Sequence, residues 1–316
     1  MRTDMTIKPA LKAVLWMIPG AALMLLFVLL AAHFYKTQNP AEELAFKAKR
    51  VDLVSRMQVA LASASEEEKS AVLAVTDEES QKFADQARAA TAQLEHERRE
   101  LDEMLKARGS QREKELLDRF SEVFTDLQRI DAEVLSLAVR NTNLKAYDLA
   151  FGPAADTLKQ MSTALARLAG SHVDSPDAKK VMLLAFGAEI SALRIQTLLP
   201  PHIAEESDQK MDALEAQMAS EEKELRRDLE GLRSLPEVRG DTELATALSC
   251  FARYAKIKTR ILALSRENTN VRSLAISLNQ KRKAMLFCQD ALSALKQAIL
   301  EEPIKGITYG NPPRPR

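Results

Sequence analysis

The chain has few of the residues that interrupt helices. Its 316 residues include only 9 glycines and 12 prolines, and several of the prolines lie near the two ends. An α/β or all-β fold needs many turns, and turns rely on these two residue types. We therefore expect an all-α protein.

Residues that recognise nucleic acids are also scarce. Aromatic residues make up 5% of the chain, and 45 basic residues are balanced by 45 acidic ones. Nucleic-acid-binding domains are typically basic and often stack bases on aromatic rings. The composition therefore predicts no nucleic-acid partner.

Metal-binding and catalytic motifs are missing from the sequence. The four histidines, His33, His96, His172 and His202, have no second histidine or cysteine at ligand spacing, and no haem-attachment motif occurs. The sequence also has no Gly-rich phosphate loop and no nucleophile elbow. We expect no metal, no cofactor and no enzymatic activity.

One long apolar run occupies residues 13–35, between Lys12 and Lys36, and it contains no Asp, Glu, Lys or Arg. A helix needs roughly 20 apolar residues to cross a bilayer. The alternative is a cleaved signal peptide, but the run is long for one, and the residues after Leu30 form a poor cleavage site. The prediction is a transmembrane helix with residues 1–12 in the cytoplasm.

This anchor predicts the location of the protein. The basic residues of segment 1–12 favour a cytoplasmic N-terminus, and a large following domain is translocated largely regardless of its charge. We expect a single-pass protein of the bacterial inner membrane, with the bulk of the chain in the periplasm.

The rest of the chain contains an internal repeat. The tripeptide Asn-Thr-Asn at 141–143 returns at 268–270, and 268 − 141 = 127. The tripeptide Glu-Glu-Ser at 78–80 returns at 205–207, and 205 − 78 is again 127. Two echoes at one offset indicate duplication of a helical unit of about this length.

Helix signals divide the first copy into four segments. Thr76 with Glu79, and Ser110 with Glu113, have the spacing of capping boxes at helix starts. A further helix is expected to start at Asn143, with a bend or brief interruption at Gly152-Pro153. Because short connections force neighbouring helices to be antiparallel, residues 41–170 should form an up-and-down four-helix bundle.

The second copy repeats this plan over residues 175–302. It is expected to have a helix to Leu199, a break at Pro200-Pro201, and a turn through Pro236 and Gly240. Residues 303–316 are polar and Pro-rich, which predicts a disordered tail. The full prediction is an N-terminal transmembrane helix followed by two tandem up-and-down four-helix bundles.

The repeated junction resembles a known family. Each third helix ends in Arg/Glu-Asn-Thr-Asn, followed by Leu/Val-Lys/Arg-x-x-x-Leu/Ile-x-Phe/Leu. This is similar to the extracytoplasmic four-helix-bundle sensor domain of methyl-accepting chemotaxis receptors. The resemblance implies a sensor that binds small anions or dipeptide-like ligands and forms a homodimer. The sequence has two copies of the unit and no output module, so signalling is expected to pass through a partner protein.

Four residues are candidates for ligand binding. Arg194 lies on a strongly apolar helix, and Arg140 lies beside Asn141 and Asn143 at a helix junction. An arginine in such a place either recognises an acid or forms a structural ion pair. The asparagines have a structural alternative too, because Asn commonly caps helices.

Cys250 and Cys288 are equidistant from Thr269 in the sequence. If the chain folded back there as an antiparallel hairpin, the two cysteines would lie level. A periplasmic location would then permit a disulfide between them. The alternative is a pair of buried free thiols.

The leading functional hypothesis is a membrane-anchored, chemoreceptor-like sensor or ligand-binding protein that acts in signal transduction. The alternative is a structural or interaction protein of the cell envelope with no small-molecule ligand. A ligand pocket between the two bundles would favour the first, and a fully packed core with no pocket would favour the second.

Overall fold

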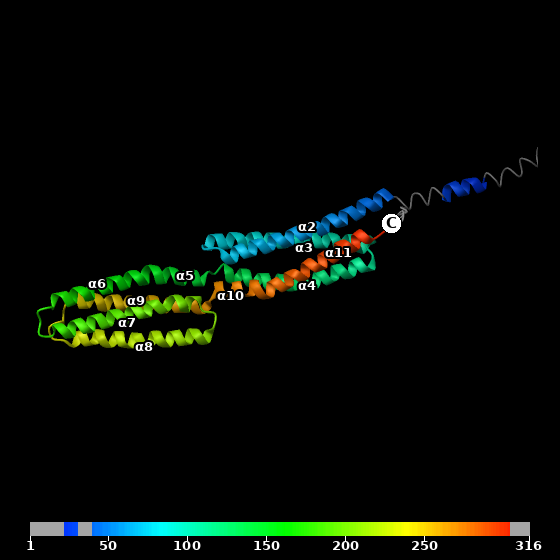
Figure 1. Cartoon of the computed structure of the whole chain (residues 1–316). Coiled ribbons are helices and arrows are strands. Elements are labelled where there is room, and N and C mark those ends of the chain that lie inside the picture. The colour runs from blue at the N-terminus through cyan, green and yellow to red at the C-terminus, as the bar shows by residue number, and fades with distance from the viewer. Residues whose placement is uncertain (1–21, 31–39, 304–316) are drawn as a thin grey trace, which may run out of the picture. The chain divides into compact units, whose positions relative to one another are not determined.

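A computed structural model of the chain describes residues 22–30 and 40–303, which contain helices and no strand (Figure 1). The all-α prediction is therefore confirmed for these residues. The helical segments from residue 40 onward are α2 (Pro40–Leu73), α3 (Asp77–Arg108), α4 (Gln111–Ala138), α5 (Thr142–Leu149), η1 (Ala150–Ala154), α6 (Ala155–Ser171), α7 (Ala178–Ala204), α8 (Asp208–Ser234), α9 (Thr242–Glu267), α10 (Thr269–Ile276), η2 (Ser277–Lys281) and α11 (Arg282–Glu301).

Most of the expected membrane segment 13–35 lies outside the described residues, as do residues 1–12 and 304–316. The described part, 22–30, is helical and exposes its side chains. Among the described helices, α7 alone has the length and apolar composition of a membrane span. Since α7 also contributes buried residues to the core described below, this composition fits a core helix as well.

The chain divides into two compact units. Unit 1 comprises the described residues within 1–58, 95–119 and 290–316, and unit 2 comprises residues 59–94 and 120–289. In unit 2, segments α5 to α9 pack around one apolar core, and Figure 1 shows α6, α7, α8 and α9 lying side by side.

Local capping signals place the helix starts correctly. The backbone N–H of Glu79 donates to Thr76 Oγ1 at 3.1 Å. Ser110 and Glu113 form both halves of a capping box, with N–H···O distances of 2.8 Å and 3.3 Å. Each pair satisfies N–H groups that the first turn of a helix would otherwise leave unpaired.

Prolines interrupt the α-helical pattern at one of the two expected places and not at the other. The predicted break at Pro200-Pro201 is wrong, because α7 continues through both and ends at Ala204. Both prolines lie in the last turn and a half of the helix, so few backbone bonds are left to lose. The predicted interruption at Gly152-Pro153 is confirmed as the π-helical turn η1. A second π-turn, η2, lies 127 residues later and contains no proline.

The fourth helical segment of each repeat packs against segments of the other repeat. In unit 2, α6 packs on α7 and α9. Also in unit 2, Lys281 of η2 bonds to Glu68 of α2. In unit 1, Gln58 of α2 forms hydrogen bonds with Ser293 and Lys296 of α11. The packing thus differs from the consecutive segments 41–170 and 175–302, which would keep each fourth helix within its own repeat.

The two Asn-Thr-Asn tripeptides meet inside unit 2. The backbone N–H of Thr142 donates to Thr269 Oγ1 at 3.2 Å, and the N–H of Thr269 donates to Thr142 Oγ1 at 3.1 Å. Asn143 and Asn270 do the same with their side-chain oxygens, at 3.2 Å and 3.1 Å. Each residue therefore bonds to its own repeat equivalent, which gives the junction a local two-fold pattern.

The preceding asparagines complete this junction. Asn141 and Asn268 have φ of 49° and 52°, the left-handed conformation that Asn tolerates better than most residues. Asn143 Nδ2 donates to Asn268 Oδ1 at 2.7 Å, and Asn270 Nδ2 donates to Asn141 Oδ1 at 2.9 Å. The repeated tripeptide is therefore explained by a reciprocal contact between the two repeats.

Replacing Thr142 or Thr269 with valine should destabilise the protein. Valine keeps the shape of threonine but leaves a buried backbone N–H without its acceptor, which costs about 1–3 kcal/mol. Urea denaturation should show this loss for each variant. The control is Thr163→Val, whose exposed hydroxyl only bonds back to Lys159 O. Equal stability of all three variants would contradict a structural role for the junction.

Candidate functional site

The two predicted arginines do not share a site, and each forms an ion pair with an acidic residue. Arg194 lies 3.4 Å from Glu221, with 65% of its side chain exposed, beside a shallow surface depression. Arg140 forms an ion pair with Glu267, its partner 127 residues away in the sequence. Both arginines thus have the structural ion pair that the sequence left open as an alternative.

Asn141 and Asn143 are buried, and the side-chain oxygen of Asn143 accepts the backbone N–H of Asn270 in the first turn of α10, so this capping acts between the two repeats. Neither Asn141 nor Asn268 makes a side-chain cap bond to the helix that follows it. Asn143 Nδ2 instead donates to Ile203 O at 2.6 Å, and Asn141 Nδ2 donates to Asp77 Oδ1 at 3.0 Å. The hydrogen bond from Lys145, followed by that from Asn141, lowers the pKa of Asp77.

The two cysteines are buried free thiols, so the proposed disulfide is not present. Cys250 lies beside Gln160 and Arg253. Cys288 has different surroundings, because burial and then the charge of Asp131 raise its pKa to about 12. Equal distance from Thr269 would place the cysteines level only in a hairpin, and the exchange of fourth segments prevents that pairing.

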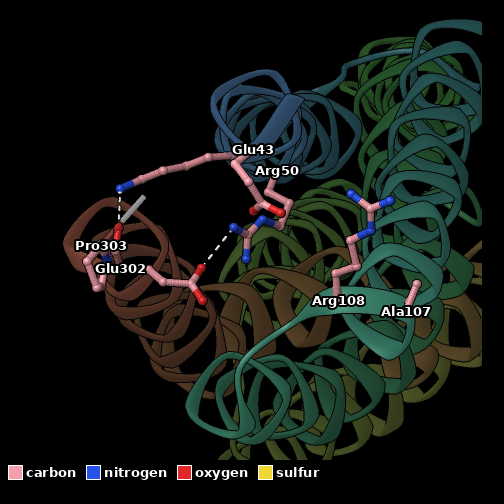
Figure 2. A pocket seen from close by; sticks show the side chains of 7 residues that line it. Glu43, Arg50, Ala107, Arg108, Glu302 and Pro303 are labelled. Carbon is pink, nitrogen blue, oxygen red and sulfur yellow. Dashed lines mark hydrogen bonds and ion pairs between the residues drawn. The ribbon is translucent and has the colours of Figure 1, made fainter. Parts of the chain in front are cut away.

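Unit 1 contains a polar cavity of about 290 Å³ that sequence analysis did not identify (Figure 2). The cavity is lined by residues from three places: the start of α2, the end of α3 and the end of α11. The lining residues are Glu43, Lys47, Arg50, Ala107, Arg108, Glu302 and Pro303.

Arg50 is the central residue of this cavity. Its Nη1 donates to both carboxylate oxygens of Glu113, at 2.6 Å and 2.7 Å, and its Nη2 donates to Glu302 Oε2 at 2.9 Å. Arg50 is only 3% exposed and Glu113 is fully buried. The Nε–H of Arg50 is buried without a hydrogen-bond partner among the described residues.

The ring of Phe46 contacts both arginines of the cavity. The guanidinium carbon of Arg50 lies 4.8 Å from the ring centroid, and that of Arg108 lies 5.6 Å from it. Such cation–π contacts favour the charged side chains near the ring and hold them in position. Arg108 also forms an ion pair with Glu42 at 3.1 Å.

Lys47 of α2 forms hydrogen bonds at the end of α11. Its Nζ donates to the carbonyl oxygens of Leu300 and Glu302, at 2.6 Å and 2.7 Å. A cation at this position stabilises the unpaired carbonyls of a helix C-terminus. The last turn of α11 therefore depends on side chains from α2.

The lining of the cavity offers guanidinium and ammonium donors, and each of its three cations already has a partner within the protein. It carries three cations, Lys47, Arg50 and Arg108, against two acids, Glu43 and Glu302. The Nε and Nη2 atoms of a guanidinium form a fork that matches the two oxygens of a carboxylate or phosphate. Glu302 accepts from Nη2, and the buried Nε–H makes no hydrogen bond among the described residues.

One pattern in the sequence marks part of this site. Phe46, Arg50, Leu53 and Met57 follow the spacing of four, three and four that marks one helix face. An arginine on an otherwise apolar face requires a partner acid. Glu113 and Glu302 are far away in the sequence, so that signal alone identifies the arginine and not the site.

The described residues contain no group of three or more His, Cys, Asp or Glu that could hold a metal ion. No known protein-family model matches the chain, and a search of curated proteins finds no match. Geometry and charge are therefore the basis for interpreting this cavity.

Replacing Arg50 with methionine should destabilise the protein by about 3–5 kcal/mol, because it leaves the buried carboxylate of Glu113 without its cation. The free energy of unfolding in urea measures this. Arg56→Met is the matched control on the same helix. Its exposed ion pair with Asp52 contributes little, so its effect should stay below about 1 kcal/mol. Similar losses of stability in the two variants would show that the buried ion pair contributes no more than the exposed one.

Proposed function

We propose that this protein is a membrane-anchored, chemoreceptor-like sensor that binds a small anion in the cavity around Arg50. The observation that supports this most is the half-occupied guanidinium fork of a buried arginine, in a cavity with two further cations. The protein would act by binding and not by catalysis.

The proposed architecture is a pair of four-helix bundles that have exchanged their fourth helices. One bundle would contain α2, α3, α4 and α11, and the other would contain α7, α8, α9 and the α5–α6 segment. The contacts of α6 with α7 and α9 support the second bundle. Residues 13–35 would anchor the chain in the bacterial inner membrane, with the bundles in the periplasm.

Anion binding has a direct structural consequence in this proposal. A ligand carboxylate that takes both Nε and Nη2 of Arg50 displaces Glu302 from Nη2. Glu302 is the residue that follows α11, and Lys47 binds its carbonyl oxygen. A ligand that binds better without Glu302 in place shifts the population towards a released end of α11. This release is the proposed signal to a partner protein.

One exposed surface supports association with another chain. Leu183, Phe186, Ile190 and Leu193 of α7 are large, apolar and exposed, and their spacing of three, four and three is that of a helix–helix seam. We assign this seam to the homodimer. In the alternative function, an envelope protein with no small ligand, the same seam would be the main interaction surface.

Isothermal titration of succinate and of inorganic phosphate into the detergent-solubilised full chain tests the anion site. Arg108→Gln should weaken binding about tenfold or more, because a charge-assisted hydrogen bond contributes about 1.5–3 kcal/mol. Glu302→Gln should strengthen binding, since it weakens the internal competitor for Arg50.

The matched control is Arg194→Gln, which removes an exposed arginine from the other unit and should leave the affinity unchanged. An absence of binding by either anion, or an equal loss in the Arg108 and Arg194 variants, would contradict the proposal and favour the alternative function.

Protease treatment of intact spheroplasts tests the proposed location. If residues 13–35 anchor the chain with its bulk in the periplasm, external protease should degrade residues 40–303 without lysis. The anchor should remain in the membrane fraction after a carbonate wash. Protection of the chain until lysis would place its bulk in the cytoplasm.

A further inference from the structure

Unit 2 contains a buried cluster of three charged side chains from three different elements. The ammonium group of Lys281, at the end of η2, donates to Glu68 Oε2 of α2 at 2.7 Å. It also lies 2.8 Å from Asp131 Oδ1 of α4. Lys281 is 3% exposed, Glu68 is 0% exposed and Asp131 is 9% exposed.

This cluster carries one cation and two acids, so with all three ionised its net charge is −1. The hydroxyl of Ser277 also donates to Glu68 Oε2, at 3.3 Å. Glu68 Oε1 is buried and has no hydrogen-bond partner among the described residues. A buried carboxylate oxygen without a donor is costly, so the cluster lacks one positive or N–H group.

A cavity of about 290 Å³ lies beside the cluster and is lined by both Glu68 and Lys281. Its wall is largely apolar, from Leu278, Met285 and Leu286. Two basic residues, Lys69 and Arg282, also line it, but they are exposed, so water and salt screen their charge.

The other repeat shows that the fold does not require this cluster. Subtracting or adding 127 takes Lys281 to Ala154, Glu68 to Ile195 and Asp131 to Lys258. Ala154 and Ile195 are fully buried in the apolar core. Lys258 pairs instead with Glu222. Both repeats have the π-turn at this position, and π-turns are frequent at functional sites.

We propose that this cavity is a second ligand site, which binds a small organic cation that has a primary ammonium group and a compact apolar body. The ammonium group donates to Glu68 and neutralises the cluster. The apolar body packs against Leu278, Met285 and Leu286. This site is independent of the anion site in unit 1 and has the opposite charge preference.

A proton competes with the ligand for the same negative charge. Burial raises the pKa of Asp131, and Lys281 partly opposes this. The other groups near Asp131 are Glu68 of α2, the neutral thiol of Cys288 of α11, and the uncharged Thr91 and Leu94 of α3. Protonation of Asp131 at low pH brings the cluster to neutrality, so cation binding weakens as the pH falls.

The test is isothermal titration of phenethylammonium chloride into the full chain in detergent at pH 8, with 2-phenylethanol and phenylacetate as matched neutral and anionic probes. Phenethylammonium should bind at least ten times more tightly than either. Glu68→Gln should weaken its binding at least tenfold, and lowering the pH to 5 should weaken it in the wild type. Asp52→Asn, which neutralises an exposed acid on the same helix away from the cavity, is the control that should have no effect.

A variant that carries Glu68→Ile, Asp131→Asn and Lys281→Ala separates binding from folding. It gives positions 68 and 281 the apolar residues of the other repeat and removes the charge at position 131, so it should retain cooperative unfolding and lose phenethylammonium binding. Arg108→Gln should bind phenethylammonium normally, which distinguishes failure of this site from failure of the anion site. The inference is overturned if the cation binds no better than the alcohol, or if the folded Glu68→Gln variant binds it as the wild type does.

Discussion

The reciprocal contact between the two Asn-Thr-Asn tripeptides is the constraint on which the arrangement of helices in unit 2 depends. Backbone N–H groups of one repeat are satisfied by side-chain oxygens of the other, in both directions. A buried N–H without an acceptor costs about 1–3 kcal/mol, so loss of this contact would leave several such groups unpaired at once. Because each residue meets its own equivalent, the contact also fixes the register between the repeats.

The exchange of fourth segments decides which side chains can meet. It brings Lys281 of the second repeat to Glu68 and Asp131 of the first. It places Ala154 of the first repeat in the core with Ile195 of the second. Equivalent positions are thus charged in one repeat, at Lys281, and apolar in the other, at Ala154. The apolar version shows that this fold packs without the buried charges.

The two candidate sites share one physical principle, which is a buried ionic group whose partners are incomplete. Within residues 22–30 and 40–303, neither the Nε–H of Arg50 nor Oε1 of Glu68 has a hydrogen-bond partner. The ligands that we propose for them carry opposite charges, an anion for the site at Arg50 and a cation for the site at Glu68. The sequence marks Arg50 as a charge on an apolar helix face. It does not mark Lys281, which becomes buried only because η2 turns it towards α2 and α4.

The sequence by itself determined the all-α class, the capped helix starts, the interruption at Gly152-Pro153 and the repeat of 127 residues. These features depend on residues that are close together in the chain, so local patterns suffice to predict them. Only the tertiary structure decided the role of the asparagines, the state of Cys250 and Cys288, and the partner of each fourth segment. Because the two repeats present similar apolar faces, the hydrophobic pattern fits an exchanged and an unexchanged arrangement alike. The choice between them depends on contacts between residues that are distant in the sequence.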